Sequence, residues 1–536
     1  SYNTFKRQTF VNENTLTYNK VFNTVHNLTI LLGQSFNVDR TDNSSLSSVG
    51  GYKNSVIRTL SAAANTTGSS SATKNVLISY FSRVEYAYKD KYLLTASLRE
   101  DGSSRFGLNT QYGVFPSASI GWRIIEEPFM KKLPVISDLK LRASYGVNGN
   151  NNVGDYGSIS TLGAYGYVLG YSTQDAALGQ APNLLADPNL KWERSQTYDL
   201  GFDFGILANR ITGSFDYYNK LNSDLLFSVP IPETSGFTSY LTNAASVRNT
   251  GEELELTSRN LTGKFQWSTT VNVSHNANKV VSLYRNQDEI VIPNSFDVSD
   301  AVLKVGYPIN SIRVVKQNGF LTQADIDNHY PVYGTGETVG DPKYIDYDGN
   351  GVITEDDKQI VGHPNPNFTW GLTNTFRYMG FDLSVLIQGQ NGGSIYSLLG
   401  RAITRTGQGY TDNAPYFYTD RWRSPDNQGA GRVSKAYSTF GFVANTDWLY
   451  SSDYYRIRDI TLGYNLKNLI KSNKIFQAIR VYATAENFFG HDKYYGGLNP
   501  EAQNTTISNN GSLPEAGDYG GLPLSKSLIF GLNVTF

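Results

Sequence analysis

The 536-residue chain contains no cysteine. This absence excludes disulfides, thiol catalysis and cysteine-based zinc sites, and it suits a compartment such as a bacterial cell envelope. The chain also lacks an excess of either charge: its formal net charge is −1, so no global field recruits nucleic acid or anionic lipid. No apolar run approaches the roughly 20 residues that a membrane-spanning helix requires. Helical membrane proteins and nucleic-acid-binding proteins are therefore poor candidates.

Aromatic residues and glycine are abundant instead. The chain has 37 Tyr, 27 Phe, 6 Trp and 50 Gly. Tyr, Phe and Thr favour strands, whereas Gly and Asn favour turns. This composition predicts an extensive antiparallel β protein.

Apolar and polar residues alternate through segments of about ten residues, which is the signature of strands with two different faces. Val84 and Tyr86 share one face, and Leu94 shares a face on the returning strand. The turn 89–91 between them predicts a tight hairpin. Further hairpin turns are expected near residues 208, 262, 379 and 470, and the strands number roughly 16 in all.

The order of short and long connections separates a membrane barrel from a soluble sandwich. Short turns alternate along the chain with long connections at 39–74, 148–193, 276–366, 391–453 and 489–524. The polar strand faces repeatedly carry charged and amide residues, as a wet lumen would, and aromatics gather near strand ends. We therefore predict an all-β fold: a transmembrane antiparallel β-barrel in the bacterial outer membrane, with short periplasmic turns and long extracellular loops.

Many segments also resemble one family. They are REDGSSRFG (99–107), FPSASIGWRI (115–124), LKLRASYGVNGN (139–150), LKWERSQTYDLGFDFG (190–205), NRITGSFDYYNK (209–220), RNTGEELEL (248–256), VGYPINSIRV (305–314), residues 346–372 and ENFFGHDKYYGGLNPE (486–501). In this order they resemble SusC-like TonB-dependent transporters of Bacteroidetes. The terminal LIFGLNVTF resembles the family's outer-membrane assembly signal.

The resemblance implies a 22-stranded barrel with an N-terminal plug, a SusD-like lipoprotein lid, and a TonB protein that pulls on the plug. Residues 1–536 show neither a TonB box nor plug motifs. We expect the chain to be the C-terminal portion of the barrel. The chain would then be part of a longer protein, a cleaved product, or one half of a split barrel whose second chain supplies the plug and first strands. The expected partners are outer-membrane lipid, the SusD-like lipoprotein and TonB, with no nucleic acid.

The stretch DYDGNGVITEDD (346–357) resembles the loop of an EF-hand. Its flanks are rich in Pro and Gly, so a sensor that opens between two helices is a poor fit. We expect a rigid loop that holds one structural Ca²⁺, with no catalytic cofactor. The expected ligands are Asp346, Asp348, Asn350, Val352, Thr354 and Asp357. A turn-rich loop with coincidental acids is the plain alternative.

Catalytic patterns are weak. The five histidines share no metal-ligand spacing, and the adjacent acid pairs point to opposite strand faces. We predict no enzyme. Ligand binding would fall instead to loop aromatics that stack on sugar rings or peptide side chains; the candidates are Tyr165, Tyr167, Tyr171, Tyr410, Tyr416, Phe417 and Tyr418.

The leading prediction is TonB-dependent import of an oligosaccharide or a peptide. Three other functions stay open. The first is a barrel component of a larger envelope complex without transport of its own. The second is a secreted β-rich glycan-binding adhesin, and the third is a calcium-dependent surface hydrolase. Partition into the outer membrane would separate the importer and the component of an envelope complex, which are both membrane barrels, from the secreted adhesin.

Overall fold

The computed structural model describes residues 1–52, 56–57, 59–168, 176–293, 300–404, 420–431, 433–436, 438, 443–466, 476–502, 517–518 and 521–535. Within these ranges, no helix has the length and apolar character needed to cross a membrane. Strands dominate instead, as the composition predicts. The chain divides into two compact units: Ser1–Glu126, Leu141–Asp199 and Lys220–Ser246 form the first, and Glu127–Lys140, Leu200–Asn219 and Val247–Phe536 form the second.

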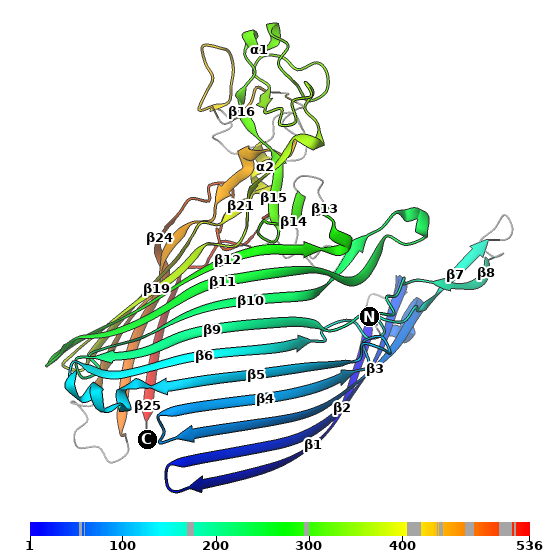
Figure 1. Cartoon of the computed structure of the whole chain (residues 1–536). Helices are drawn as coiled ribbons and strands as arrows, with labels where there is room; N and C mark the ends of the chain where they lie inside the picture. Colours follow the sequence, from blue (N-terminus) through cyan, green and yellow to red (C-terminus); the bar gives the residue numbers. More distant parts are fainter. Residues whose placement is uncertain are drawn as a thin grey trace. The chain divides into compact units, whose positions relative to one another are not determined.

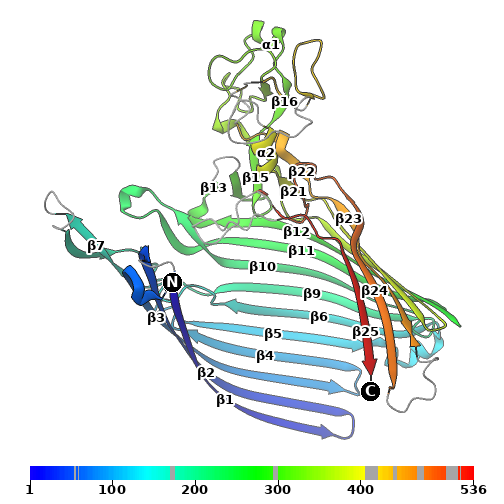
Figure 2. The same cartoon turned by 180° about the vertical axis from the view of Figure 1, so that it is seen from behind.

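Among the described residues, fifteen strands make the main sheet, in the order β1-β2-β3-β4-β5-β6-β9-β10-β11-β12-β19-β20-β23-β24-β25. The number agrees with the prediction of roughly 16 strands from the sequence. The first unit holds β1 (Tyr2–Phe22), β2 (His26–Tyr52), β3 (Ala63–Tyr88), β4 (Tyr92–Ser103) and β5 (Tyr112–Arg123), which lie side by side in Figures 1 and 2. The second holds β12 (Phe265–Leu283), β19 (Phe368–Tyr378), β20 (Phe381–Asn391), β23 (Tyr454–Asn465), β24 (Ala478–Asp492) and β25 (Ser527–Thr535). The strands β6 (Ile136–Asn150), β9 (Glu193–Ile206), β10 (Ile211–Pro230) and β11 (Ser239–Thr262) contribute to both units.

The predicted short turns are present where positive backbone angles permit them. Lys89 and Asp90 have φ of 53° and 48°, and Met379 and Gly380 have φ of 46° and 92°. Leu207, Ala208 and Asn209 form a third such turn. The turn expected near residue 470 lies outside the described residues.

Antiparallel register gives each strand two distinct faces. In the first unit, Val84 lies opposite Ile30 on one side and Ala96 on the other. The next residues along the same strands are polar: Arg83 lies opposite Ser97, whose hydroxyl is 2.7 Å from that of Ser117. The apolar face suits lipid and the polar face suits the wet interior of a barrel.

The long connection predicted at 39–74 is wrong. β2 runs to Tyr52 and β3 begins at Ala63, so both strands continue well into this range, with a 3₁₀ turn at Leu60–Ala62. Ser, Thr and Asn dominate here, so the apolar alternation that marks a membrane strand is absent. Backbone pairing continues because Ser44 to Val49 of β2 face Ser70 to Asn65 of β3.

The other long connections contain structure of their own. In the connection predicted at 148–193, β7 (Leu162–Val168) pairs with β8 (Ala176–Pro182). Between β12 and β19, four strands form a small sheet, and β16 (Gln317–Phe320) pairs with β17 (Pro342–Tyr344). The four strands are β13 (Glu289–Pro293), β14 (Asp300–Lys304), β15 (Ser311–Val315) and β18 (Lys358–Gly362). The helix α1 (Gln323–Asp327) follows β16, and α2 (Leu398–Thr404) follows β21 (Ser394–Tyr396), which pairs with β22 (Leu449–Ser451).

Packed cores lie in the connections and where the main sheet borders them, as at Phe115 of β5 and Val147 of β6. In the first unit, Phe106, Phe115 and Trp192 pack with Val147, Val153 and Leu190. In the second unit, one cluster contains Ala301, Ile312, Val314, Tyr396, Leu398, Ala444 and Trp448, and another contains Val315, Tyr344, Ile353 and Val443. We call the part of the second unit that holds these two clusters the outer-loop core. The membrane strands bury little because their apolar faces meet lipid.

Candidate functional site

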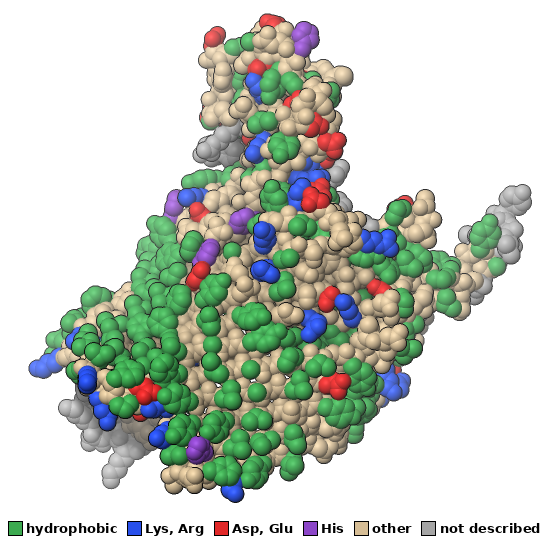
Figure 3. Space-filling model, in the orientation of Figure 1, with side chains coloured by type: hydrophobic (Ala, Val, Ile, Leu, Met, Phe, Trp, Pro, Cys, Tyr) green, Lys and Arg blue, Asp and Glu red, His purple; other side chains and the backbone are tan. Residues whose placement is uncertain are grey.

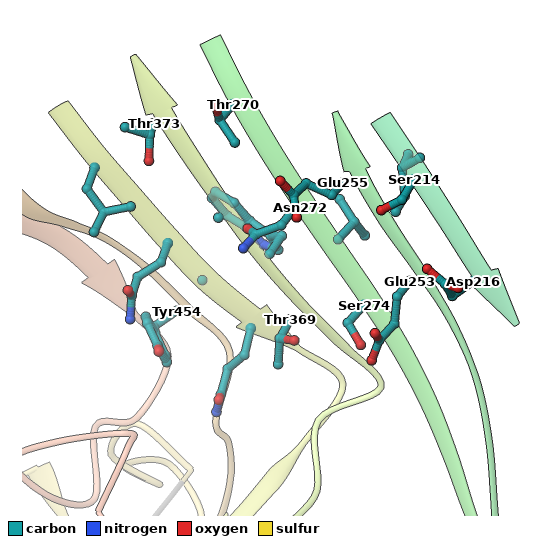
Figure 4. A pocket seen from close by; sticks show the side chains of 18 residues that line it. Ser214, Asp216, Glu253, Glu255, Thr270, Asn272, Ser274, Thr369, Thr373 and Tyr454 are labelled. Atoms are coloured by element: carbon teal, nitrogen blue, oxygen red, sulfur yellow. The ribbon is translucent and has the colours of Figure 1, made fainter. Parts of the chain in front are cut away.

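A pocket of about 730 Å³ lies against the sheet in the second unit. Figure 4 shows side chains from neighbouring strands lining it. Most of the lining is polar, as expected for the interior face of a barrel. It comprises Ser214 and Asp216 of β10, Glu253, Leu254 and Glu255 of β11, Thr270, Asn272, Val273 and Ser274 of β12, Thr369, Trp370, Gly371 and Thr373 of β19, Leu386, Gln388, Gly389 and Gln390 of β20, and Tyr454 of β23.

Strand register explains why these residues meet. Thr270 lies opposite Thr373, and Asn272 lies opposite Gly371. A Cβ atom on Gly371 would stand 2.3 Å from Asn272 Oδ1, so glycine leaves room for the Asn272 side chain as it lies here. The alternate residues are apolar, as in the Val271–Leu372 pair, and face the other side of the sheet. Six consecutive strands therefore present hydroxyl and amide groups to one space.

The pocket is acidic. Asp216, Glu253 and Glu255 all line it, and its described lining includes no Lys or Arg. Glu253 and Glu255 are two residues apart on one strand, so their side chains share a face. An acidic, hydroxyl-rich wall suits a neutral or cationic solute and repels an anionic one. The sequence does not predict a role for this pair, because acids that are adjacent in sequence, such as Glu252 and Glu253, are the ones that stand out in it.

Beside the pocket, one carboxylate ties the last long connection to the sheet. Glu501 accepts a hydrogen bond from the Tyr454 hydroxyl at 2.6 Å and from Arg456 Nη1 at 2.9 Å, and it also pairs with Arg458. All three partners belong to β23, more than 40 positions away along the chain. No local sequence signal links residues so far apart. Glu501 therefore anchors the described part of this connection over the strand that contributes Tyr454.

The calcium-type loop is tightly ordered by its own backbone. Asp346 accepts hydrogen bonds from the N–H groups of Gly349 at 2.8 Å and Gly351 at 2.9 Å. Both glycines have positive φ, 72° and 86°, which a side chain would strain. The Gly351 N–H is the main reason that the pKa of Asp346 lies below its usual value. The backbone of the loop is therefore folded around the Asp346 carboxylate.

Three of the predicted metal ligands come together. The nearest carboxylate oxygens of Asp346, Asp348 and Asp357 lie within 4.8 Å of one another, the sole such acid or histidine group among the described residues. Asp357 is buried and accepts from the N–H groups of Tyr347 at 2.6 Å and Thr354 at 2.7 Å. Carboxylate oxygens are the ligands that Ca²⁺ prefers, so the set fits a hard cation of this kind.

The remaining predicted ligands have local partners. The Asn350 side-chain oxygen accepts from the N–H of Val352 at 2.8 Å, and the Thr354 hydroxyl accepts from the N–H of Asp356 at 3.2 Å. Thr354 thereby caps the 3₁₀ turn Glu355–Asp357. In the described residues, β17 precedes the loop and β18 follows this turn, so no α-helix flanks it. This arrangement differs from the helix–loop–helix of an EF-hand sensor, and calcium binding by the loop stays a prediction.

Only two of the seven aromatic residues that we predict to bind a ligand lie within the described residues. Tyr165 and Tyr167 lie on β7, with 52% and 71% of their surfaces exposed. Tyr171, Tyr410, Tyr416, Phe417 and Tyr418 lie outside the described residues. Tyr165 and Tyr167 belong to the first unit and the pocket to the second. Their role in ligand binding stays a prediction.

Two carboxyl groups of the second unit, those of Asp447 and Glu337, predict that the stability of the outer loops depends on pH. Burial raises the pKa of Asp447 to about 7 and that of Glu337 to about 7. A carboxyl whose pKa is higher in the folded chain stabilises folding fully below its unfolded pKa, and this stability is lost as pH rises through the folded value. We therefore expect the outer loops to become more protease-sensitive between about pH 4 and 7. Asp447→Asn should flatten that pH profile, whereas Asp426→Asn, at an exposed position, should leave it unchanged.

Long antiparallel strands with one apolar face, one wet face and unequal connections define an outer-membrane β-barrel. Residues 1–318 match the family described as "TonB dependent receptor-like, beta-barrel", and the chain belongs to that family. Proteins of this family are transporters in the outer membrane rather than enzymes, in agreement with the sequence prediction.

Individual relatives fit this assignment. The chain is 33% identical over 533 residues to TonB-dependent receptor P3 of Formosa agariphila, covering 98% of this chain and 52% of that protein. It is 32% identical over 482 residues to TonB-dependent receptor SusC of Bacteroides thetaiotaomicron, covering 87% of this chain and 44% of that protein. The solved structure of the RagAB peptide transporter shares the fold, with a TM-score of 0.85 at 22% identity over 100% of this chain and 56% of that one. The chain thus spans about half the length of the curated relatives it matches.

Proposed function

We propose that the chain forms the barrel wall of a TonB-dependent importer that moves an oligosaccharide or a peptide across the outer membrane. The observation that carries the proposal is the polar pocket on the interior face of the sheet. Hydroxyl, amide and carboxylate groups from six strands offer many hydrogen bonds to a large, polar solute. Similarity to SusC and to the RagAB peptide transporter supports this class of cargo.

The full transporter requires parts beyond these residues. We infer that a plug, and through it TonB, is supplied by the rest of a longer protein or by a second chain, because the matched relatives are about twice as long. We further propose a SusD-like lipoprotein as the lid. The structured connections between β12 and β19 and between β20 and β23 are the surface on which such a lid would rest.

Deleting the gene in its native host tests the transport proposal. We expect growth on one class of oligomer, glycan or peptide, to stop, while growth on the corresponding monomers continues. Uptake should also collapse when TonB is removed, and a lipoprotein should copurify with the barrel. Unchanged growth on every oligomer, together with isolation of the barrel in a stable assembly, would instead indicate an envelope component without transport of its own.

We also propose that the loop 346–357 holds one structural Ca²⁺. Three clustered carboxylates repel one another without a cation, and their oxygen ligands match the preference of Ca²⁺. The bound ion would fasten Asp346 and Asp348 to the buried Asp357. At a hundredfold excess over the Kd, binding would stabilise the loop by about 2.7 kcal/mol.

Asp348→Ala is expected to abolish calcium protection of this loop. Wild-type protein should resist proteolysis near residue 348 in calcium and lose that resistance in chelator, whereas the variant should be equally sensitive in both. The control is Asp356→Ala, an exposed acid outside the three-carboxylate group. The proposal of a structural Ca²⁺ would be refuted if wild type resisted protease equally with and without calcium and elemental analysis found no calcium in the protein.

A further inference from the structure

A second pocket, of about 580 Å³, lies at the short-turn end of the second unit. It is formed where β12 begins, where β19 turns into β20, and where β23 ends beside the start of β24. Its charged lining consists of Lys264, Arg377, Arg480 and Asp382. We call the space lined by these four residues the basic turn-end pocket.

The basic turn-end pocket lies on the interior face of the sheet. Arg377 lies opposite Gln266 on β12 and opposite Asp382 on β20. Four residues further along β12, Thr270 lies opposite Thr373, and both line the polar pocket described above. Side chains an even number of residues apart on a strand point to the same side. Since short turns of outer-membrane barrels face the periplasm, this pocket lies at the periplasmic end of the interior.

One acid serves three cations in this pocket. Arg480 donates to Asp382 through Nε at 3.0 Å and through Nη2 at 2.5 Å, so these two groups neutralise each other. The charge of Arg377 also acts on Asp382, but Arg377 forms no ion pair with a described residue. Lys264, in the turn before β12, likewise has no ion-pair partner in the described part of the chain. Two exposed positive charges therefore line the pocket without an acid of their own.

Acids are scarce throughout this end of the second unit. The four hairpin segments 204–213, 259–268, 375–384 and 462–481 contain eight Lys or Arg residues and a single acid, Asp382. The connection 127–140 adds three lysines and two acids, Glu127 and Asp138. Asp203, just before the first hairpin segment, pairs with Lys140 at 4.0 Å. Figure 3 shows basic side chains at the left end of the sheet, where these turns lie in Figure 1. With every one of these acids counted, positive charge remains in excess.

We propose that the basic turn-end pocket binds the carboxylate side chains of an acidic polypeptide segment that enters the barrel from its periplasmic end. Arg377 offers a carboxylate a planar fork of N–H donors, and Lys264 offers an ammonium group with three. Both side chains are exposed, so a partner can reach them without unfolding the sheet.

Two observations favour a polypeptide segment over the imported cargo as the source of the carboxylates. The polar pocket carries Asp216, Glu253 and Glu255, so an anionic cargo that passes it would be repelled before it reached the periplasmic end. The matched relatives are about twice as long as this chain, which leaves polypeptide available to occupy that end. The inference rests on the proposal that a further segment closes the barrel, and it adds the charge and the contact site of that segment.

The expected contacts are reversible. An ion pair in a wet site strengthens association by about fivefold at most, and salt weakens it. A few such pairs would hold the segment in one position and still release it when it moves. Neutral hydroxyl and amide groups, which line the polar pocket, would not select an acidic segment in this way.

Carbodiimide cross-linking of the full-length protein in outer-membrane vesicles tests the proposal. This zero-length reagent joins a lysine amine only to a carboxylate in contact with it, and mass spectrometry identifies the peptide joined to Lys264. We expect an Asp or Glu from outside residues 1–536. Lys279, which is exposed toward the other end of β12, is the matched control and should not be joined to that segment.

Arg377→Gln should lower the yield of the Lys264 cross-link about two- to fivefold, because one of the two cations that face the segment is removed. Raised salt should lower it further. Lys279→Gln should leave the yield unchanged, and heat-modifiable migration shows that each variant is folded. An unchanged yield in folded Arg377→Gln would overturn the proposal.

Three other outcomes would also overturn it. Cross-linking of Lys264 to Asp382 alone would show that the pocket is closed by its own acid. Loss of the cross-link on addition of millimolar succinate would indicate a site for soluble carboxylates instead of a polypeptide. A missing cross-link in cells that still import the cargo would refute the acidic segment and leave the transport proposal standing.

Discussion

Replacing Val84 with Arg is expected to destabilise the folded barrel by about 2–4 kcal/mol, the cost of a cation near the bilayer midplane. Val84 lies between Ile30 and Ala96, four residues from Tyr88 at the short-turn end of β3. The guanidinium would have to remain in hydrocarbon or distort the bilayer around it. Unfolding in urea from phospholipid vesicles measures the difference from wild type, and the heat-modifiable band reports folding.

Thr95→Arg is the matched control. Thr95 adjoins Ala96 on β4 but belongs to the polar face, directly opposite Glu85. An arginine there meets water and an acidic neighbour, so we expect a change of less than about 1 kcal/mol. If the two substitutions cost the same, the assignment of lipid and interior faces is wrong. The neighbouring Arg83 already shows that this polar face accepts a guanidinium.

Strand positions and faces were predictable because they depend on local alternation. Val84, Tyr86 and Leu94 share a face in the structure as the sequence indicates. The boundaries were less predictable: residues 39–52 continue β2 although their apolar alternation ends. Alternation reports what a strand face contacts, not whether its backbone pairs. Outside lipid, both faces become polar while hydrogen bonding between strands persists.

The site was predictable only where its residues are close in sequence. Asp346, Asp348 and Asp357 belong to one loop, so spacing alone brings them together. The acidic pocket depends on register between strands that are separated by long connections, such as β12 and β19. The anchoring of Glu501 by Arg456 likewise joins residues 45 positions apart. Local pattern carries no information about such pairs.

Trp448→Ala is expected to unfold much of the outer-loop core while leaving the membrane sheet intact. Trp448 is buried, with 6% of its surface exposed, and packs with Tyr396, Val314 and Leu398. Removing a buried Trp costs about 3–5 kcal/mol because the cavity does not close fully. That loss is comparable to the stability expected of a small structured region.

The sheet should survive because hydrogen bonds between its paired strands, and contact of its apolar face with lipid, do not depend on Trp448. The variant should therefore keep its heat-modifiable band but be cleaved rapidly between residues 284 and 366 in limited proteolysis. Tyr347→Ala is the control: it removes an aromatic residue that is 65% exposed in the same region. Retained protease resistance in Trp448→Ala would show that the outer loops do not depend on this core. If the loops unfold and the barrel persists, uptake should also decrease, because the surface on which the proposed lid would rest is lost.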